Sequence, residues 1–235
     1  MRFSNIENKI VDWLARPEKA PVRARTAEEY RKDLFPEFYS EESLLQYLSG
    51  KTVADIGSGA THKNPYSLAN VIIRHPEKHI KFFGIEPKVG VQKYKSKISR
   101  RGFEEGLMEH LNRFVVTGFS EIKRGTPAEK NVISAKAENL PIAEGKLDLL
   151  LSDYFFPLWV GDDDQALTML MEFTKSLKLG GEIRLGPISE TNDSDNSRLT
   201  NRGTPLGDFL HKNFAVHHSG HTLILRKDPI VQDKE

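Results

Sequence analysis

The stretch VADIGSGAT, residues 53–61, places a carboxylate just ahead of two closely spaced glycines. Asp55 stands near the end of an apolar run that predicts a buried strand, and Gly57 and Gly59 follow where the chain turns toward a helix. Glycines at such a turn let the backbone adopt positive φ and approach a ligand closely. The turn is therefore a candidate binding site, although an isolated pair of glycines also occurs in tight turns that bind nothing.

The acid at position 55 indicates the charge of the ligand. A dinucleotide-binding turn needs a third glycine where this chain has His62, and it places a pyrophosphate near a helix N-terminus. A carboxylate beside that site would repel the pyrophosphate but attract a cation. The stretch favours a positively charged ligand, which makes a nicotinamide-dependent dehydrogenase the weaker alternative.

The elements that hold this turn are expected to alternate between strands and helices, which predicts an α/β fold with a parallel sheet. The expected strands are 52–56, 80–85, 131–134, 147–152 and 181–185, and the expected helices include 64–75 and 164–179. Two later strand-like runs, FAVHHSG and HTLILRK, are joined too closely for a helical crossover. We therefore expect them to pair antiparallel.

Composition narrows the class of protein. The chain has 235 residues and no cysteine, which excludes disulfides, thiolate metal sites and a cysteine nucleophile and suits a cytoplasmic location. Its 34 Lys and Arg residues against 33 Asp and Glu residues give a net charge of +1, so no strong general attraction to nucleic acid is expected. No apolar run approaches the roughly 18 residues of a membrane span, and no membrane partner is expected.

Residues 51–235 are expected to form one globular domain, preceded at 1–50 by a helical extension. The extension is a candidate lid over the site, because its arginines and tyrosines can contact a polar ligand while shielding it from water. The candidate substrate or lid residues are Tyr30, Arg31 and Tyr39, and a cation among Arg23, Arg25 and Arg31 is a candidate partner for a ligand carboxylate. The connection 87–130 is the alternative lid.

Several motifs in order resemble those of the class I S-adenosylmethionine-dependent methyltransferases, from about Lys51 to Lys227. VADIGSGA resembles the first motif, FFGIEPK the second, AENLPI the next loop, LDLLLSDYFFPLW the fourth strand and the loop after it, and LKLGGEIRLGP the fifth helix and strand. The resemblance implies a Rossmann-like, seven-stranded mixed sheet with helices on both faces and an antiparallel final strand. It also implies S-adenosyl-L-methionine as the cofactor.

The resemblance further implies roles for particular residues. Asp55 would orient the ammonium group of the cofactor, Glu86 would accept both ribose hydroxyls, and Ala137 with Glu138 would face the adenine. The complete expected cofactor-binding set is Asp55, Gly57, Ser58, Gly59, Glu86, Ala137, Glu138 and Ser152. The chain departs from the family pattern at Lys136, where an acid often binds the adenine amino group, and at Thr61, which replaces a third glycine sometimes found in the first motif.

Asp153 and Tyr154 are the candidate catalytic residues, because they follow the fourth strand at the edge where open α/β sheets bind ligands. Asp153 would take a proton from the attacking group, and Tyr154 would help to wall the pocket. Three consecutive acids, 162–164, precede an apolar-periodic run, as a helix N-terminus favours, so no metal site is expected.

The expected function is methyl transfer to an oxygen or nitrogen nucleophile of an unidentified substrate, with a small molecule favoured. Three alternatives stay open at this point. A basic run within 88–101 is the support for an rRNA or tRNA methyltransferase. A scaffold that binds the cofactor without turnover fits the same motifs, and a nicotinamide-dependent dehydrogenase would use the same kind of sheet.

Overall fold

The computed structural model describes residues 25–58, 65–86, 132–153, 156, 163–186, 188, 199 and 201–228. All of them belong to one unit, which comprises Ala24–Lys88 and Thr126–Glu235. The expected division of the chain at residue 50 stays a prediction. Across the described ranges, no helix combines the length and the apolar character needed to cross a membrane.

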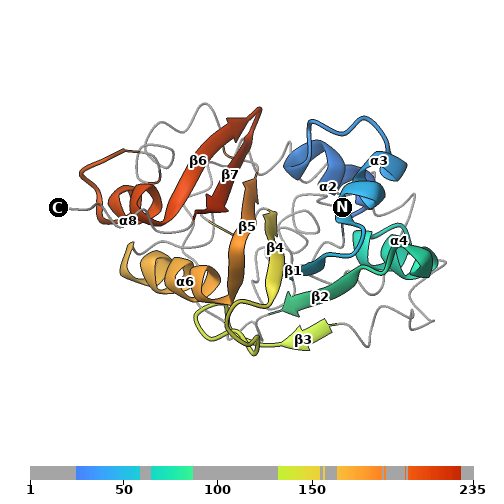
Figure 1. Ribbon diagram of the computed structural model, residues 1–235, viewed down its shortest axis with the longest axis horizontal. Helices are drawn as coiled ribbons and strands as arrows, with labels where there is room; N and C mark the ends of the chain where they lie inside the picture. Colours follow the sequence, from blue (N-terminus) through green and yellow to red (C-terminus); the bar gives the residue numbers. More distant parts are fainter. Residues whose placement is uncertain are drawn as a thin grey trace, which may run out of the picture. The chain divides into compact units, whose positions relative to one another are not determined.

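A seven-stranded sheet forms the centre of this unit (Figure 1). Its strands are β1 (Thr52–Ile56), β2 (Lys81–Glu86), β3 (Val132–Ser134), β4 (Leu147–Asp153), β5 (Leu177–Gly186), β6 (Phe214–Ser219) and β7 (Thr222–Lys227). Their order across the sheet is β3-β2-β1-β4-β5-β7-β6. Strands β1 to β5 are parallel, and β7 runs antiparallel to both β5 and β6. The expected mixed sheet with a reversed final strand is confirmed.

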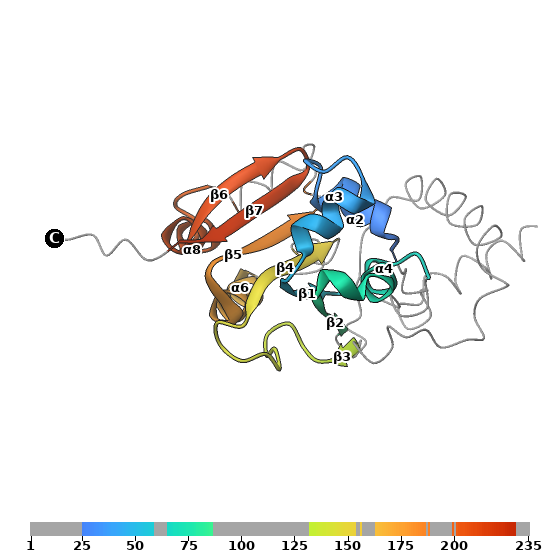
Figure 2. The same ribbon diagram turned by 45° about the vertical axis from the view of Figure 1, so that its right-hand side comes forward.

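Helices cover both faces of the sheet (Figures 1 and 2). The described helices are α2 (Ala27–Leu34), α3 (Glu41–Leu48), α4 (Leu68–Arg74), the short 3-10 helix η3 (Pro76–Lys78), α6 (Asp163–Ser176) and α8 (Pro205–Asn213). Thr26 and Ser40 cap the N-termini of α2 and α3 through their side-chain oxygens. Such caps supply acceptors for backbone N–H groups that the first helical turn leaves unpaired.

The core consists of two apolar layers, one on each face of the sheet. Leu150 and Ile183 belong to the layer packed under α6 and α8, whereas Leu149 and Leu151 belong to the layer packed under α2, α3 and α4. Neighbouring residues of a strand point to opposite faces, so a strand covered on both sides is apolar throughout. This explains why LDLLLS is a continuous apolar run.

Two helices differ from their expected bounds. The helix expected over 64–75 begins at Leu68, because Ser67 caps its N-terminus, and it ends at Arg74. The helix expected to reach residue 179 ends at Ser176, because Leu177 already pairs with Leu147 of β4. The register shifts between Leu147 and Leu149, and Gly180 has a φ of +75° within the extended segment. Gly180 and Gly181, which suggested the end of a helix, therefore lie in the irregular first part of β5.

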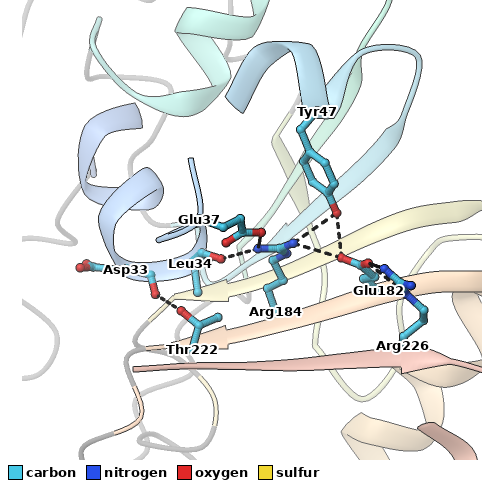
Figure 3. Close-up of polar contacts among 8 residues, drawn as sticks. All are labelled: Asp33, Leu34, Glu37, Tyr47, Glu182, Arg184, Thr222 and Arg226. Atoms are coloured by element: carbon cyan, nitrogen blue, oxygen red, sulfur yellow. Dashed lines mark hydrogen bonds and ion pairs between the residues drawn. The ribbon is translucent and has the colours of Figure 1, made fainter. Parts of the chain in front are cut away.

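The C-terminal end of α2 is fixed to β5 and β7 (Figure 3). The Arg184 guanidinium donates to the Leu34 carbonyl over 2.9 Å, and the Thr222 hydroxyl donates to the Asp33 carbonyl over 2.6 Å. A Cβ atom at Gly186 would lie 2.8 Å from that same Asp33 carbonyl oxygen. Glycine at the end of β5 therefore permits the close approach of the helix to the sheet.

Arg184 is also the buried centre of an ionic network that joins the sheet to the segment carrying α2 and α3 (Figure 3). Its guanidinium lies 2.6 Å from a Glu37 oxygen and 3.3 Å from a Glu182 oxygen. Glu182 in turn accepts from the Tyr47 hydroxyl over 2.7 Å and from Arg226 over 2.5 Å. Each buried charge of the network thus has an opposite charge or a hydrogen-bond donor beside it.

Candidate functional site

The candidate site lies where the sheet reverses its order of assembly, between β1 and β4. The chain builds β2 and β3 on one side of β1 and then returns to place β4 and β5 on the other side. Ligands of open α/β sheets bind in the crevice at such a switch point, outside the carboxyl ends of the strands. Asp55 lies one residue before the end of β1, and Asp153 is the last residue of β4. Asp55 pairs in register with Leu151, which is two residues before Asp153.

The turn after β1 has the backbone conformation expected from its glycine. Gly57 has a φ of +72°, and its N–H donates to the Ile85 carbonyl of β2 over 2.9 Å. Ser58 follows as a buried residue, and its hydroxyl has no hydrogen-bond partner among the described residues. Gly59 lies outside the described residues, so its expected contact with a ligand stays a prediction.

Asp153 is a buried carboxylate that shares a cation with a second acid. Arg25, just before α2, donates to Asp153 Oδ2 and also lies 3.2 Å from Asp33. Burial raises the pKa of Asp153 to about 7, against the opposing effect of Arg25 and with the added effect of the Asp33 and Glu29 charges. A carboxylate that exchanges its proton near neutral pH is well suited to act as a general base.

The raised pKa of Asp153 makes the stability of the fold depend on pH. The protonated carboxyl stabilises the native state fully below the ordinary Asp pKa, and this contribution is lost as pH rises through about 7. Each unit of pKa shift corresponds to about 1.4 kcal/mol, so wild type loses about 2 kcal/mol of this contribution between pH 5 and pH 7. Asparagine does not titrate, so we expect the free energy of unfolding of Asp153→Asn to rise by about 2 kcal/mol relative to that of wild type over the same range. Urea unfolding at several pH values measures the slope.

Asp148→Asn is the matched control for this experiment. Asp148 belongs to the same strand, but its pKa is lowered: the raising effect of burial is outweighed by the combined hydrogen bonds from Lys178 and Thr52 and the positive charges of Lys178 and Lys51. Its contribution is present above the ordinary Asp pKa and is lost as pH falls, so this variant is not expected to gain stability between pH 5 and pH 7. A pH-independent difference between Asp153→Asn and wild type would contradict the assignment.

Among the candidate substrate or lid residues, Tyr30 reaches the site directly. Its ring is buried under α2, and its hydroxyl donates to Asp55 Oδ2. Arg31 instead pairs with Glu28, with nitrogen to oxygen distances of 2.7 and 2.8 Å, and Tyr39 is 89% exposed. The expected contact of Tyr30, Arg31 and Tyr39 with a ligand stays a prediction.

The contacts of Arg25 and Tyr30 with the two aspartates are the features of the site that sequence reasoning missed. The sequence made Arg25, together with Arg23 and Arg31, a candidate partner for a ligand carboxylate, whereas the structure places Arg25 on Asp153. The available signal was the presence of arginines and tyrosines ahead of the first strand. No local pattern predicts these contacts, because Asp55 follows Tyr30 by 25 positions and Asp153 follows Arg25 by 128 positions.

The residues expected near the adenine lie in the turn after β3. Ala137 is buried, and Glu138 accepts from the Gln165 side chain of α6 over 2.6 Å. Lys136 and Asn139 bridge the two sides of this turn through their backbones. These contacts fix the shape of the turn, and its contact with an adenine stays a prediction.

The remaining expected residues lie at the same edge or beyond the described part. Glu86 ends β2 and pairs in register with Ser134, but its side chain lies outside the described atoms. Ser152 is buried, and its hydroxyl accepts from the Phe156 N–H over 3.0 Å, which holds the chain after β4. Tyr154 and the basic run at 88–101 lie outside the described residues.

The described acids do not assemble into a metal centre. No group of three histidine or acidic side chains within the described ranges has an arrangement that could hold a metal ion. Asp163 and Asp164 are exposed in the first turn of α6, where carboxylates stabilise the helix dipole. The expectation that the protein needs no metal stays a prediction.

A cavity of about 310 Å³ lies at the opposite edge of the sheet. Thr52, Lys81 and Lys146, at or next to the amino ends of β1, β2 and β4, line it together with apolar side chains such as Phe83 and Ile133. The described residues that line this cavity include no carboxylate, and the cavity lies away from the switch point. We therefore assign the site to the carboxyl edge.

The residues of the carboxyl edge fit S-adenosylmethionine, whose ammonium and sulfonium groups are cationic. A buried polar atom without a partner costs about 1–3 kcal/mol, so such atoms are ordinarily satisfied by protein, water or ligand. Ser58 Oγ and Asp153 Oδ1 are buried atoms of this kind, with no hydrogen-bond partner within the described part of the chain. Together with the Asp55 carboxylate and the Gly57 turn, they form a polar edge suited to a cation.

The strand order, the reversed β7 and the helices on both faces form the Rossmann-like mixed sheet that the sequence predicts. No protein-family model matches the chain, and no curated protein matches it.

Solved structures similar to the chain include S-adenosylmethionine-dependent methyltransferases from Aquifex aeolicus and Methanosarcina mazei and the antibiotic-resistance methyltransferase Kmr. Their identities are 14%, 15% and 12%, and their TM-scores are 0.41, 0.42 and 0.43. The matches cover 85%, 77% and 80% of this chain and 92%, 93% and 92% of the respective structures. Similarity at this level leaves the reaction and the substrate undefined.

Proposed function

We propose that the protein is an S-adenosylmethionine-dependent methyltransferase that methylates an oxygen or nitrogen nucleophile of a small molecule. The observation that carries the proposal is the pair of buried carboxylates, Asp55 and Asp153, at the switch point of the sheet beside the positive-φ turn at Gly57. We assign Asp55 to the binding of a cationic cofactor and Asp153 to proton transfer.

The cofactor supplies an electrophilic methyl group on a sulfonium. In the proposed site Asp55 binds the ammonium group, Ser58 lies at the same turn, and Glu86 at the end of the neighbouring strand binds the ribose hydroxyls. Ala137 and Glu138 bound the adenine side. Their positions along one edge of β1, β2 and β3 support this assignment.

Asp153 is the proposed general base. Its carboxylate would accept the proton that the attacking N–H or O–H group gives up when it is methylated. Its raised pKa and its burial support this role, because the proton affinity is matched to neutral pH. Tyr154 is proposed to wall the substrate pocket, and the segment that contains α2 is proposed to cover it.

Titration calorimetry of the whole chain with S-adenosylmethionine and S-adenosylhomocysteine tests the proposal. Both are expected to bind with micromolar Kd, because they share the ammonium, ribose and adenine groups. Absence of heat with both ligands would overturn the proposed function. Binding without transfer of labelled methyl to a panel of small amines and alcohols would favour a non-catalytic scaffold.

A further inference from the structure

We infer that Tyr30 is a positioning residue for the cofactor site: its hydroxyl holds the Asp55 carboxylate in the orientation that receives the amino group of the ligand. The inference rests on the proposed function and extends it to a residue outside the motifs of the sheet. The observation behind it is the hydrogen bond from the Tyr30 hydroxyl to Asp55 Oδ2.

The Tyr30 ring is packed so that its hydroxyl has little freedom. The residue is 2% exposed and belongs to the apolar layer that also contains Leu34 of α2, Val53 of β1 and Leu151 of β4. Val53 lies two residues before Asp55 in β1, and Leu151 lies two residues before Asp153 in β4. The packing therefore directs the phenol at the carboxyl end of β1.

Contacts at both ends of α2 fix the helix that carries Tyr30. At the N-terminal end the Thr26 hydroxyl accepts from the Glu29 N–H over 3.1 Å, and the Glu29 carboxylate accepts from the Thr26 N–H over 2.9 Å. At the C-terminal end Arg184 and Thr222 hold the backbone carbonyls of the last turn. The hydroxyl is thus placed before any ligand arrives, which lowers the entropic cost of organising the site.

Tyr30 stays a donor over the physiological pH range. Burial, followed by the negative charges of Asp55 and Asp153, raises its pKa well above the ordinary tyrosine value. A neutral phenol can donate to the Asp55 carboxylate without neutralising its charge, so this hydrogen bond is compatible with a cationic ligand at the same carboxylate. An arginine at position 30 would compete with the ligand for that charge instead.

A positioning role differs measurably from a purely structural one. If Tyr30 acts through Asp55, its hydroxyl affects the part of the ligand that carries the ammonium group. S-adenosylhomocysteine has that group, whereas 5′-methylthioadenosine has the adenine and ribose but lacks the amino acid portion. A structural defect at α2 would weaken the binding of both molecules.

The experiment measures Kd for these two ligands by calorimetry with wild type, Tyr30→Phe, Asp55→Asn and the double variant. Tyr30→Phe is expected to weaken S-adenosylhomocysteine about tenfold, the size typical of one hydrogen bond to a charged group, and to leave methylthioadenosine unchanged. In the Asp55→Asn background the tyrosine change is expected to have little further effect, because the two residues act as one unit.

Tyr47→Phe is the matched control. Its hydroxyl also donates to a largely buried carboxylate, Glu182, but that pair lies away from the β1–β4 switch point. The Tyr47→Phe substitution is expected to leave both Kd values unchanged. Thermal unfolding of each variant tests whether that variant is folded.

Unchanged or equally weakened binding of the two ligands in Tyr30→Phe would overturn the inference while leaving the proposed function in place. Full additivity of the tyrosine and aspartate changes would also overturn it. A wild-type protein that binds neither ligand would instead contradict the proposed function.

Discussion

Exchanging Arg184 for methionine is expected to lower the free energy of unfolding by about 4 kcal/mol, because removal of one partner from a buried ion pair typically costs about 3–5 kcal/mol. The Arg184 side chain is only 4% exposed, and its guanidinium stacks 4.5 Å from the Phe35 ring centre while it binds the Leu34 carbonyl and Glu37. Methionine keeps much of the apolar volume but leaves these acceptors without their cation. The midpoint of thermal unfolding should fall by roughly 10 °C.

Arg226→Met is the control for this change. Arg226 also binds Glu182, but its side chain is 56% exposed, and exposed ion pairs contribute about 0–1 kcal/mol. Urea unfolding of the two variants separates the buried and the exposed member of the same network. Equal losses in the two variants would contradict the role of Arg184 in fixing α2 to the sheet.

Asp55→Asn is expected to weaken S-adenosylhomocysteine binding by at least about 30-fold. Truncating a charge from a buried, hydrogen-bonded pair costs about 2–5 kcal/mol in binding, and each 1.4 kcal/mol is a factor of ten. The asparagine side chain has nearly the same shape and can still accept from the Tyr30 hydroxyl. The substitution therefore removes the charge with little change in packing.

Asp148→Asn makes the same change at the opposite end of the neighbouring strand. Asp148 accepts from the Thr52 N–H over 2.8 Å and from Lys178 over 2.7 Å at the amino edge of the sheet. Its replacement is expected to leave the Kd of S-adenosylhomocysteine unchanged in calorimetry. If both variants lost the same affinity, the loss would reflect stability rather than a contact with the ligand.

The strands of the sheet could be predicted because burial on both faces leaves a continuous apolar run. The expected strand 52–56 agrees with β1, and the expected strand 147–152 ends one residue before the end of β4. The expected end of the helix at residue 179 was wrong by three residues. Two glycines after a lysine are typical of a helix stop, and only the pairing of Leu177 with Leu147 shows that a strand has already begun.

The site could be predicted only in part, because some of its contacts join residues that are far apart in the sequence. The Gly57 turn and the position of Asp153 at a strand end follow from local patterns. The contacts of Tyr30 with Asp55 and of Arg25 with Asp153 depend on how α2 packs across the sheet. Helix propensity and capping predict that α2 forms, but they carry no information on which strand ends it covers.

The structure of the protein bound to S-adenosylhomocysteine is the most direct test of the proposed cofactor site. We expect the ligand at the carboxyl ends of β1 and β2, with its amino group within hydrogen-bonding distance of Asp55, its ribose hydroxyls on Glu86 and its sulfur toward Asp153. A ligand bound at the amino edge, in the cavity beside Lys81 and Lys146, would contradict this account.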